Sequence, residues 1–383
     1  MTKAPENLLV RGVNWLGDAV MTTPALLRLR GAFPEAKITL LTPEKLRELW
    51  TGHPAFDAVL TFTPQESVWQ VGRRLRGGGF TTALVLPNSP RSALEPWWAG
   101  IPERVGYARS WRNWFLTRRV APRPEAVAMR KRPAAEIRRL TAGPPPAPPR
   151  PPPPAAHHLH QYLHLAAALG ANPAPLAPRI AVADFAVEQF VDRFGLRAAD
   201  GTLPTYFALN AGAAYGPAKC WPLERFHAAA REIQARTRGR WLIFGVDQPG
   251  DPGPRLATEL AASAATGLGP PPPGTPPWVV NLVGRSGLGD LCAGLRLSRV
   301  LLANDSGPMH LAAAVGTAVV ATFGGTSPEL TGPGLPGDPR VLCLRSPQPV
   351  PCSPCFLRVC PIDFRCMTGI SVEQAVAAVL ALA

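Results

Sequence analysis

The chain has 383 residues, too many for one ordinary hydrophobic core, so we expect two domains. With 46% hydrophobic residues it can bury a core without disulfides. We expect a cytoplasmic protein, because the sequence lacks both a signal-peptide pattern and the run of about 18 apolar residues that a membrane span needs. The formal charge of +14 predicts an anionic partner, either a nucleic acid, a phosphorylated lipid or a negative membrane surface, although an Arg-rich, GC-rich genome explains the total equally well.

The first 120 residues alternate short apolar runs with helical patterns. A helix is expected over residues 21–32. Strands are expected over residues 7–12, 37–42, 57–62 and 81–86. Alternation at this spacing predicts a parallel, doubly wound sheet.

Two proline-rich stretches interrupt the pattern, at residues 143–154 and 270–277. Prolines cannot donate ladder or helix hydrogen bonds, so we expect the first stretch to be a polyproline II spacer or a disordered loop. The second is expected to be a surface loop.

The alternation resumes near Pro204. A helix is expected over residues 222–237 with Pro222 at its first position, and a last helix over 371–382 with a capping box of Ser371 and Gln374. Strands are expected over residues 205–210, 241–245, 279–283, 299–303 and 318–323. The sequence therefore predicts a second doubly wound α/β domain, with ligands at the carboxyl ends of the strands.

The first candidate loop, residues 11–18, joins the first strand to the first helix. Gly12 and Gly17 allow close approach of a ligand to the backbone, and Asp18 falls at the start of the helix. Asp18 is either a functional carboxylate or an ordinary N-cap. The glycine spacing departs from the dinucleotide fingerprint G-x-G-x-x-G, which argues against an NAD enzyme.

The second loop, residues 210–222, is rich in small residues, among them Gly212 and Ala213, and delivers Lys219 just before a helix. Open amides and a lysine suit a phosphate, whereas a turn with a solvated lysine is the alternative.

The third loop, residues 304–310, opens a helix of small residues. Free amides at that helix start suit a pyrophosphate, but Asp305 and Ser306 are also suited to cap the helix without any ligand.

Together these loops resemble one family. The order Gly17-Asp18, then LPNS at 86–89, PAKCWP at 217–222 and NDSGPMHLAAA at 304–314 is similar to the ADP-heptose:lipopolysaccharide heptosyltransferases, glycosyltransferase family 9, over roughly residues 8–344. The segment 86–106 is closest to the heptosyltransferase II branch.

The resemblance implies a GT-B architecture, that is, two doubly wound Rossmann-like domains facing across a cleft. We expect an acceptor-binding domain at residues 1–142 and an ADP-heptose-binding domain at residues 179–370, joined by a linker at 143–178. A C-terminal helix at 371–383 is expected to pack back on the first domain. The implied reaction is inverting transfer of L-glycero-D-manno-heptose from ADP-heptose to the lipopolysaccharide inner core, as the second heptose, with a heptosyltransferase I or III type acceptor as the alternative.

The resemblance also assigns roles to residues of this chain. Asp18 matches the general base, and Lys219 matches the lysine that stabilises the diphosphate. The expected donor-binding residues are Gly17, Gly212, Ala213, Lys219, Asp247, Ser286, Asp305, Ser306, Gly307 and His310. The expected acceptor-binding residues are Asn88, Arg91, Arg104 and Arg112. No cofactor is required.

Four cysteines lie close together near the C-terminus: Cys352, Cys355, Cys360 and Cys366. Their spacing allows one structural metal, structural thiols that are reduced or disulfide-linked, or a redox role. It matches neither a zinc ribbon nor a ferredoxin run.

The implied partners are ADP-heptose and the lipid A–Kdo acceptor at the cytoplasmic face of the inner membrane, where a basic chain associates peripherally. A sugar-nucleotide-binding module without turnover and a metal-binding regulator are alternatives. No nucleic-acid partner is expected, because no helix-turn-helix, RRM or zinc-finger pattern accompanies the basic charge.

Overall fold

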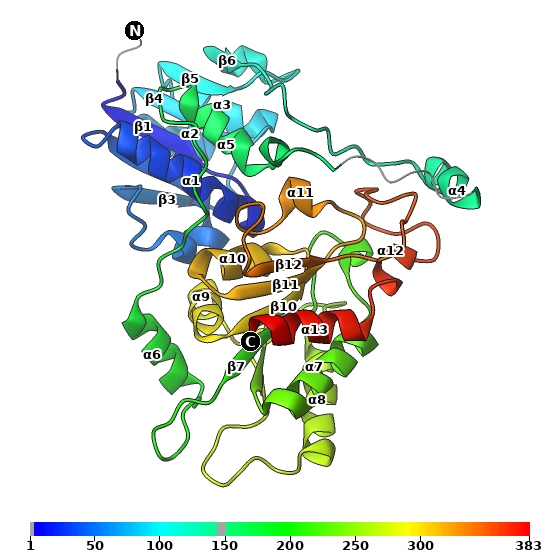
Figure 1. Ribbon diagram of the computed structural model, residues 1–383. Helices are drawn as coiled ribbons and strands as arrows, with labels where there is room; N and C mark the ends of the chain where they lie inside the picture. Colours follow the sequence, from blue (N-terminus) through cyan, green and yellow to red (C-terminus); the bar gives the residue numbers. More distant parts are fainter. Residues whose placement is uncertain (1–3, 144–150) are drawn as a thin grey trace. The chain divides into compact units, whose positions relative to one another are not determined.

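The computed structural model describes residues 4–143 and 151–383 and divides the chain into two compact units (Figure 1). The first unit combines Met1–Val127 with Pro153–Ala181, and the second combines Ala128–Pro152 with Val182–Ala383. The boundaries drawn from the sequence differ, because residues 128–142 cluster with the second unit and residues 153–178 with the first. Most of the first proline-rich stretch, residues 144–150, lies outside the described residues.

The first unit is built on a six-stranded sheet in the order β3-β2-β1-β4-β5-β6, in which every pairing is parallel. Its strands are β1 (Asn7–Arg11), β2 (Lys37–Pro43), β3 (Ala58–Phe62), β4 (Thr82–Val85), β5 (Glu103–Tyr107) and β6 (Arg118–Val120). Its helices are α1 (Leu16–Ala32), η1 (Glu44–Trp50), α2 (Val68–Arg76), α3 (Pro90–Trp98), η2 (Asn113–Phe115), η3 (Pro154–Ala156) and α5 (Leu159–Ala167).

The second unit repeats this order with β12-β11-β10-β7-β8-β9, again all parallel. Its strands are β7 (Tyr206–Asn210), β8 (Arg240–Ile243), β9 (Val279–Asn281), β10 (Val300–Asn304), β11 (Ala318–Thr322) and β12 (Val341–Leu344). Its helices are α4 (Ala134–Ala142), α6 (Asp184–Arg193), η4 (Pro217–Lys219), α7 (Leu223–Thr237), α8 (Gly253–Gly267), α9 (Leu288–Leu297), α10 (Gly307–Val315), α11 (Pro328–Thr331), α12 (Arg365–Thr368) and α13 (Val372–Leu382). The prediction of two doubly wound α/β domains is confirmed.

Each sheet reverses its strand order once, between β1 and β4 in the first unit and between β7 and β10 in the second. At such a switch point the loops leave the sheet in opposite directions and open a crevice at the carboxyl ends of the strands. All three candidate loops of the sequence leave from these points, after β1, β7 and β10.

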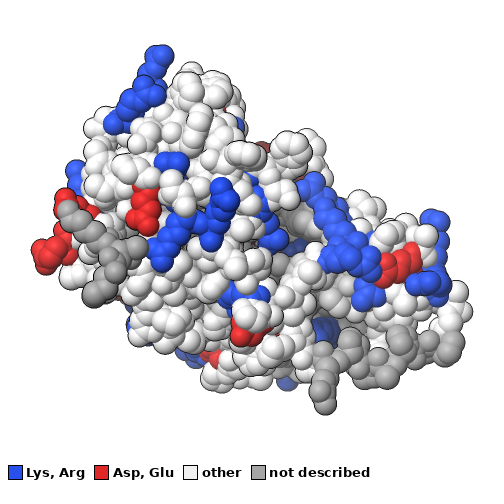
Figure 2. All heavy atoms as spheres, turned by 90° about the horizontal axis from the view of Figure 1, so that it is seen from above, with Lys and Arg blue, Asp and Glu red and all other residues white. Residues whose placement is uncertain are grey.

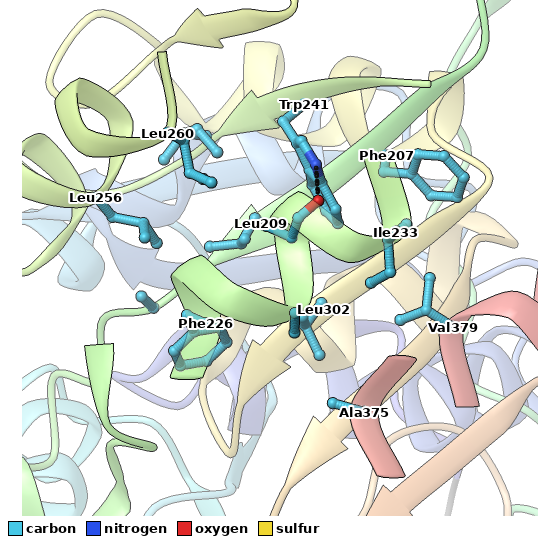
Figure 3. Close-up of a cluster of buried hydrophobic side chains, with 14 of the residues drawn as sticks. Phe207, Leu209, Phe226, Ile233, Trp241, Leu256, Leu260, Leu302, Ala375 and Val379 are labelled. Atoms are coloured by element: carbon cyan, nitrogen blue, oxygen red, sulfur yellow. Dashed lines mark hydrogen bonds between the residues drawn. The ribbon is translucent and has the colours of Figure 1, made fainter. Parts of the chain in front are cut away.

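The core of the second unit packs α7 and α13 against the sheet (Figure 3). Trp241 of β8 is fully buried and donates its indole N–H to the carbonyl of Ala230 in α7 at 3.1 Å. Ala375 and Val379 of α13 belong to the same buried cluster. The last helix is therefore part of the second unit, and it carries the expected capping box of Ser371 and Gln374.

The structure corrects two local predictions. The first helix begins at Leu16 rather than residue 21, with Trp15 as its N-cap, so Asp18 lies inside the first turn and does not cap. Pro222 is the N-cap of α7 rather than its first residue. No helix in the two described ranges is long and apolar enough to cross a bilayer.

Candidate functional site

The loop between β1 and α1 is held by a buried ion pair. Arg11, at the end of β1, donates from Nε to Glu95 of α3 at 2.7 Å, and both side chains are almost completely buried. The same guanidinium donates to the carbonyl of Gly12 and to the side chain of Asn14. Arg11 thus fixes the backbone that leads into α1 and Asp18.

Glu95→Ala should destabilise the first unit by about 3–5 kcal/mol, because the Arg11 guanidinium would remain buried without its counter-charge. Urea unfolding followed by tryptophan fluorescence measures this as a lower midpoint. Glu44→Ala is the matched control, since its ion pair with Arg47 is exposed, and its midpoint should not move. An unchanged midpoint in Glu95→Ala would show that the pair does not hold this loop.

Asp18 faces two side chains of α5. Tyr162 donates its hydroxyl to the Asp18 carboxylate at 3.3 Å, and Nε2 of His158 lies 3.8 Å from the same oxygen. Burial first, and then the Asp18 charge, raise the pKa of Tyr162 well above its ordinary value. Burial lowers the pKa of His158 although Asp18 opposes the shift, so we expect a neutral imidazole at neutral pH.

Neither partner of Asp18 was predicted from the sequence. They come from a segment about 140 residues further along, and no local pattern links the two. The spacing of His158 and Tyr162, one helical turn apart, was the available signal, since it places a histidine and a tyrosine on one face of a helix.

Two of the four predicted acceptor residues meet at the same edge of the sheet. Arg112, in the loop after β5, donates from Nη1 to the side chain of Asn88, in the loop after β4, at 3.2 Å. The Arg112 side chain is completely buried, and its Nε and Nη2 have no hydrogen-bond partner in the described part of the chain. Burial, reinforced by the charge of Arg109, lowers the pKa of Arg112 to about 10. A buried cation with open donors suits an anionic group.

The other two predicted acceptor residues lie apart from this pair and make internal contacts. Arg91 pairs with Glu95 at 3.2 Å and donates to the carbonyl of Glu66. Arg104 donates to the backbone carbonyl of Phe115 at 2.7 Å and to that of Ile101. Both guanidinium groups therefore brace the loops of the first unit.

In the second unit the structure brings Lys219 and Asp305 together. The Lys219 ammonium lies 2.6 Å from the Asp305 carboxylate, which also accepts a hydrogen bond from Thr326 at 2.5 Å. Lys219 also stands 5.0 Å above the ring of Tyr215, and the guanidinium of Arg358 lies 5.4 Å from that ring. Two cations thus flank one aromatic ring at the switch point of the sheet.

Asn304, the last residue of β10, ties these loops to one another. Its side chain donates to the carbonyl of Ala211 at 2.6 Å and accepts from the amide of Trp221 at 2.8 Å and from Thr322. The residue is completely buried. This one amide therefore fixes both ends of the loop that carries Lys219.

Ser306 is the N-cap of α10, but its hydroxyl makes no capping bond; the oxygen is buried and has no hydrogen-bond partner in the described residues. Gly307 opens the helix, and His310 is buried one turn further on. The simple capping alternative for Asp305 and Ser306 does not hold, since Asp305 is engaged by Lys219. α10 starts beside this cluster, and the positive end of its helix dipole favours negative charge there.

The remaining predicted donor residues follow β7, β8 and β9. Gly212 lies against the carboxylate of Asp251, which sequence reasoning missed and which accepts the amide of Gly253 at 2.8 Å. Asp247 packs against Gly284, two residues before Ser286, whose hydroxyl donates to the carbonyl of Leu282. A side chain at Gly212 would collide with Asp251, so these loops are closely packed.

The cysteine-rich segment braces the Lys219 loop. The amide of Ala218 donates to the carbonyl of Arg358 at 3.0 Å, and Tyr215 donates its hydroxyl to the carbonyl of Phe356 at 2.8 Å. Cys355 donates its amide to the carbonyl of Gly325, next to Thr326.

The thiols of this segment are free, and no group of three or more His, Cys, Asp or Glu in the described ranges is arranged to hold a metal ion. Burial raises the pKa of Cys352, and it raises that of Cys366 to about 12, so both thiols stay protonated at neutral pH. The observed contacts are those of a structural segment.

Comparison with known proteins gives a family. The model of glycosyltransferase family 9 (heptosyltransferase) matches residues 149–364, more than half of the chain. The chain is 27% identical to lipopolysaccharide heptosyltransferase 2 of Escherichia coli (strain K12) over 343 residues, 85% of each protein.

Solved structures agree in fold. The chain superimposes on the E. coli ADP-heptose lipopolysaccharide heptosyltransferase II with a TM-score of 0.75 at 23% identity, covering 98% of both chains. It superimposes on an E. coli heptosyltransferase with ADP with a TM-score of 0.66 at 15% identity, covering 98% of this chain and 100% of that one. The predicted GT-B fold class is confirmed.

Proposed function

Since the chain belongs to glycosyltransferase family 9, the heptosyltransferases, and is a glycosyltransferase, we propose that it transfers L-glycero-D-manno-heptose from ADP-heptose to the inner core of lipopolysaccharide. The proposed acceptor is heptosyl-Kdo2-lipid A, which receives its second heptose in this reaction. The curated relatives that it matches are named heptosyltransferase 2. The observation that carries the proposal is the contact of Lys219 with Asp305 beside the start of α10, where the family resemblance expects the diphosphate.

The proposed reaction is a single displacement with inversion. Asp18 takes the proton of the acceptor hydroxyl, whose oxygen forms a bond to the anomeric carbon of heptose. The bond from that carbon to the diphosphate oxygen breaks, and its electron pair leaves with ADP. Lys219 and the amides of α10 stabilise the charge that develops on the diphosphate.

Tyr162 is the proposed positioning residue for the base. Its ring is buried and its hydroxyl donates to the oxygen of Asp18, so it holds the carboxylate in one orientation. The neutral His158 beside it leaves the negative charge of Asp18 uncompensated.

The proposed acceptor contact is the pair of Asn88 and Arg112. Asn88 follows β4, the neighbour of β1, and Arg112 follows β5, the next strand along, so both lie at the sheet edge from which Asp18 projects. The acceptor named by the resemblance carries phosphates and Kdo carboxylates, and the open donors of Arg112 suit either group. Arg91 and Arg104 are proposed to support this edge rather than to contact the acceptor.

The remaining assignments are proposals of the same kind. Gly212, Ala213 and Ser306 are proposed to offer backbone and hydroxyl groups to the donor, with Asp247 and Ser286 near the adenosine. The reaction requires no cofactor, because Lys219 and the helix start supply the positive charge. We propose that the enzyme works at the cytoplasmic face of the inner membrane.

The test is incubation of the purified protein with ADP-heptose and with Kdo2-lipid A acceptors that carry zero or one heptose. We expect ADP release and a mass gain of one heptose on the mono-heptosylated acceptor. Transfer only to the heptose-free acceptor would move the chain to the first-heptose reaction. ADP-heptose binding without transfer to either acceptor would indicate a non-catalytic module.

A further inference from the structure

The first unit exposes five tryptophans in one stretch of surface, which we call the tryptophan band: Trp69, Trp97, Trp98, Trp111 and Trp114. Trp69 of α2 contacts Trp98 of α3, with ring centres 4.2 Å apart. Trp97 contacts Phe115, the neighbour of Trp114 in η2, at 5.5 Å. The band thus runs from α2 across α3 to the loop after β5.

The rings protrude rather than pack. Trp111 and Trp114 keep 83% and 82% of their surface exposed, and Trp69 keeps 50%. A lone exposed tryptophan needs no explanation, but a contiguous group marks an interaction surface. Tryptophan is the side chain most suited to a boundary between water and an apolar phase, because its large ring carries one polar N–H.

Exposed arginines lie beside the tryptophans of the band. Arg73 and Arg74 line a shallow pocket of about 340 Å³ together with Trp69, Gln70 and Trp98. Arg74 is paired with Glu66 at 3.0 Å, whereas Arg73 is exposed and has no ion pair within the described ranges. Residues 104–124, which include Trp111 and Trp114, contain six arginines and no acidic residue, and Arg109 and Arg119 of this segment are exposed. On the face of the molecule drawn in Figure 2, Lys and Arg side chains cover more of the surface than Asp and Glu side chains do.

We propose that the tryptophan band is the surface by which this protein docks on an anionic phospholipid bilayer, with the indoles at the headgroup level and the arginines against lipid phosphates. The choice of a bilayer rests on charge and shape. Arginines beside the band attract a negative surface, and the protruding rings of Trp111 and Trp114 have no surrounding walls of the kind that enclose a bound saccharide. The inference rests on the proposed function in one respect, namely that the acceptor is a membrane lipid.

The experiment is co-sedimentation of the full chain with vesicles of phosphatidylglycerol and phosphatidylethanolamine. We expect the wild type to bind, to bind less at high salt, and to bind weakly to pure phosphatidylcholine. The double variant Trp69→Gln/Trp114→Gln should bind about tenfold more weakly, since two rings are lost from the headgroup region. Arg73→Gln, which removes no ion pair of the described residues, should bind more weakly and lose part of the salt dependence.

Phe185→Gln is the matched control, because Phe185 of α6 is 67% exposed but lies in the other unit. Its vesicle binding should equal that of the wild type. Equal binding by the tryptophan double variant and the wild type would overturn the proposal, as would failure of the wild type to bind anionic vesicles at low salt.

A second readout separates this proposal from the proposed function. Transfer of heptose to a deacylated, water-soluble acceptor should be unchanged in the tryptophan double variant, whereas transfer to the acceptor in vesicles should fall. Loss of transfer to the soluble acceptor would instead make the band a saccharide site and overturn membrane docking. A wild type that binds vesicles through the band but transfers no heptose would refute the proposed function and leave the docking surface standing.

Discussion

Asp18→Asn should lower the rate of heptose transfer about a thousandfold while leaving the affinity for ADP-heptose unchanged. The substitution keeps the size of the side chain and its contact with Tyr162, but removes the carboxylate in the first turn of α1 that is proposed to accept the proton. Without a base, the acceptor hydroxyl attacks as a neutral group. Single-turnover transfer, with donor binding measured by calorimetry, separates the two quantities.

Tyr162→Phe is the companion variant, since it removes the hydroxyl that orients Asp18 but keeps the ring in the core. We expect a smaller loss of rate, about tenfold, with the affinity for ADP-heptose unchanged, because the carboxylate loses the hydrogen bond that holds it in one orientation. Full activity of Asp18→Asn would remove Asp18 from the mechanism.

Lys219→Met should lower the transfer rate about a hundredfold or more, because one of the fixed charges proposed to stabilise the departing diphosphate is lost. The variant should also be less stable, since Asp305 is buried and, among the described residues, its carboxylate would keep Thr326 as a partner but no counter-charge. Transfer kinetics and urea unfolding measure the two effects separately.

The double variant Lys219→Met/Asp305→Asn distinguishes a structural from a catalytic role of the lysine. It removes the unpaired charge, so the stability should recover relative to Lys219→Met, but the transfer rate should remain low. Recovery of the rate together with the stability would show that Lys219 acts only by holding the loop.

Five of the six strands of the second unit were predictable, because each contains a run of apolar residues that stands between recognisable helices. The three strands that were missed are β5, β6 and β12. In β5, Glu103 and Arg104 interrupt the apolar pattern, and in the edge strand β6 two arginines do so. The edge strand β12 is apolar but only half-buried, because the outermost strand of a sheet buries less of its surface. Edge position is a property of the fold and is not visible in a local window.

The site was predictable where a loop follows a strand of recognisable pattern, as with Asp18, Lys219 and Asp305. Their contacts were not, because Tyr162 and Asn304 act across the fold. The family resemblance named Arg104 as an acceptor residue, yet the structure shows its guanidinium engaged by backbone carbonyls. The sequence shows that an arginine stands at this position. Which groups its guanidinium contacts depends on the loops that the fold brings near it.

The first unit is discontinuous, since the chain leaves it at Val127 and returns at Pro153. Its last strand, β6, ends at Val120, but α5, which supplies Tyr162 and packs on α1, follows only after residues assigned to the second unit. During synthesis from the N-terminus, the sheet of the first unit is therefore made well before the neighbours of Asp18. The strands of the first unit leave the ribosome before α5 does. Until α5 has been synthesised, it cannot cover the face of α1 on which it packs in the folded protein.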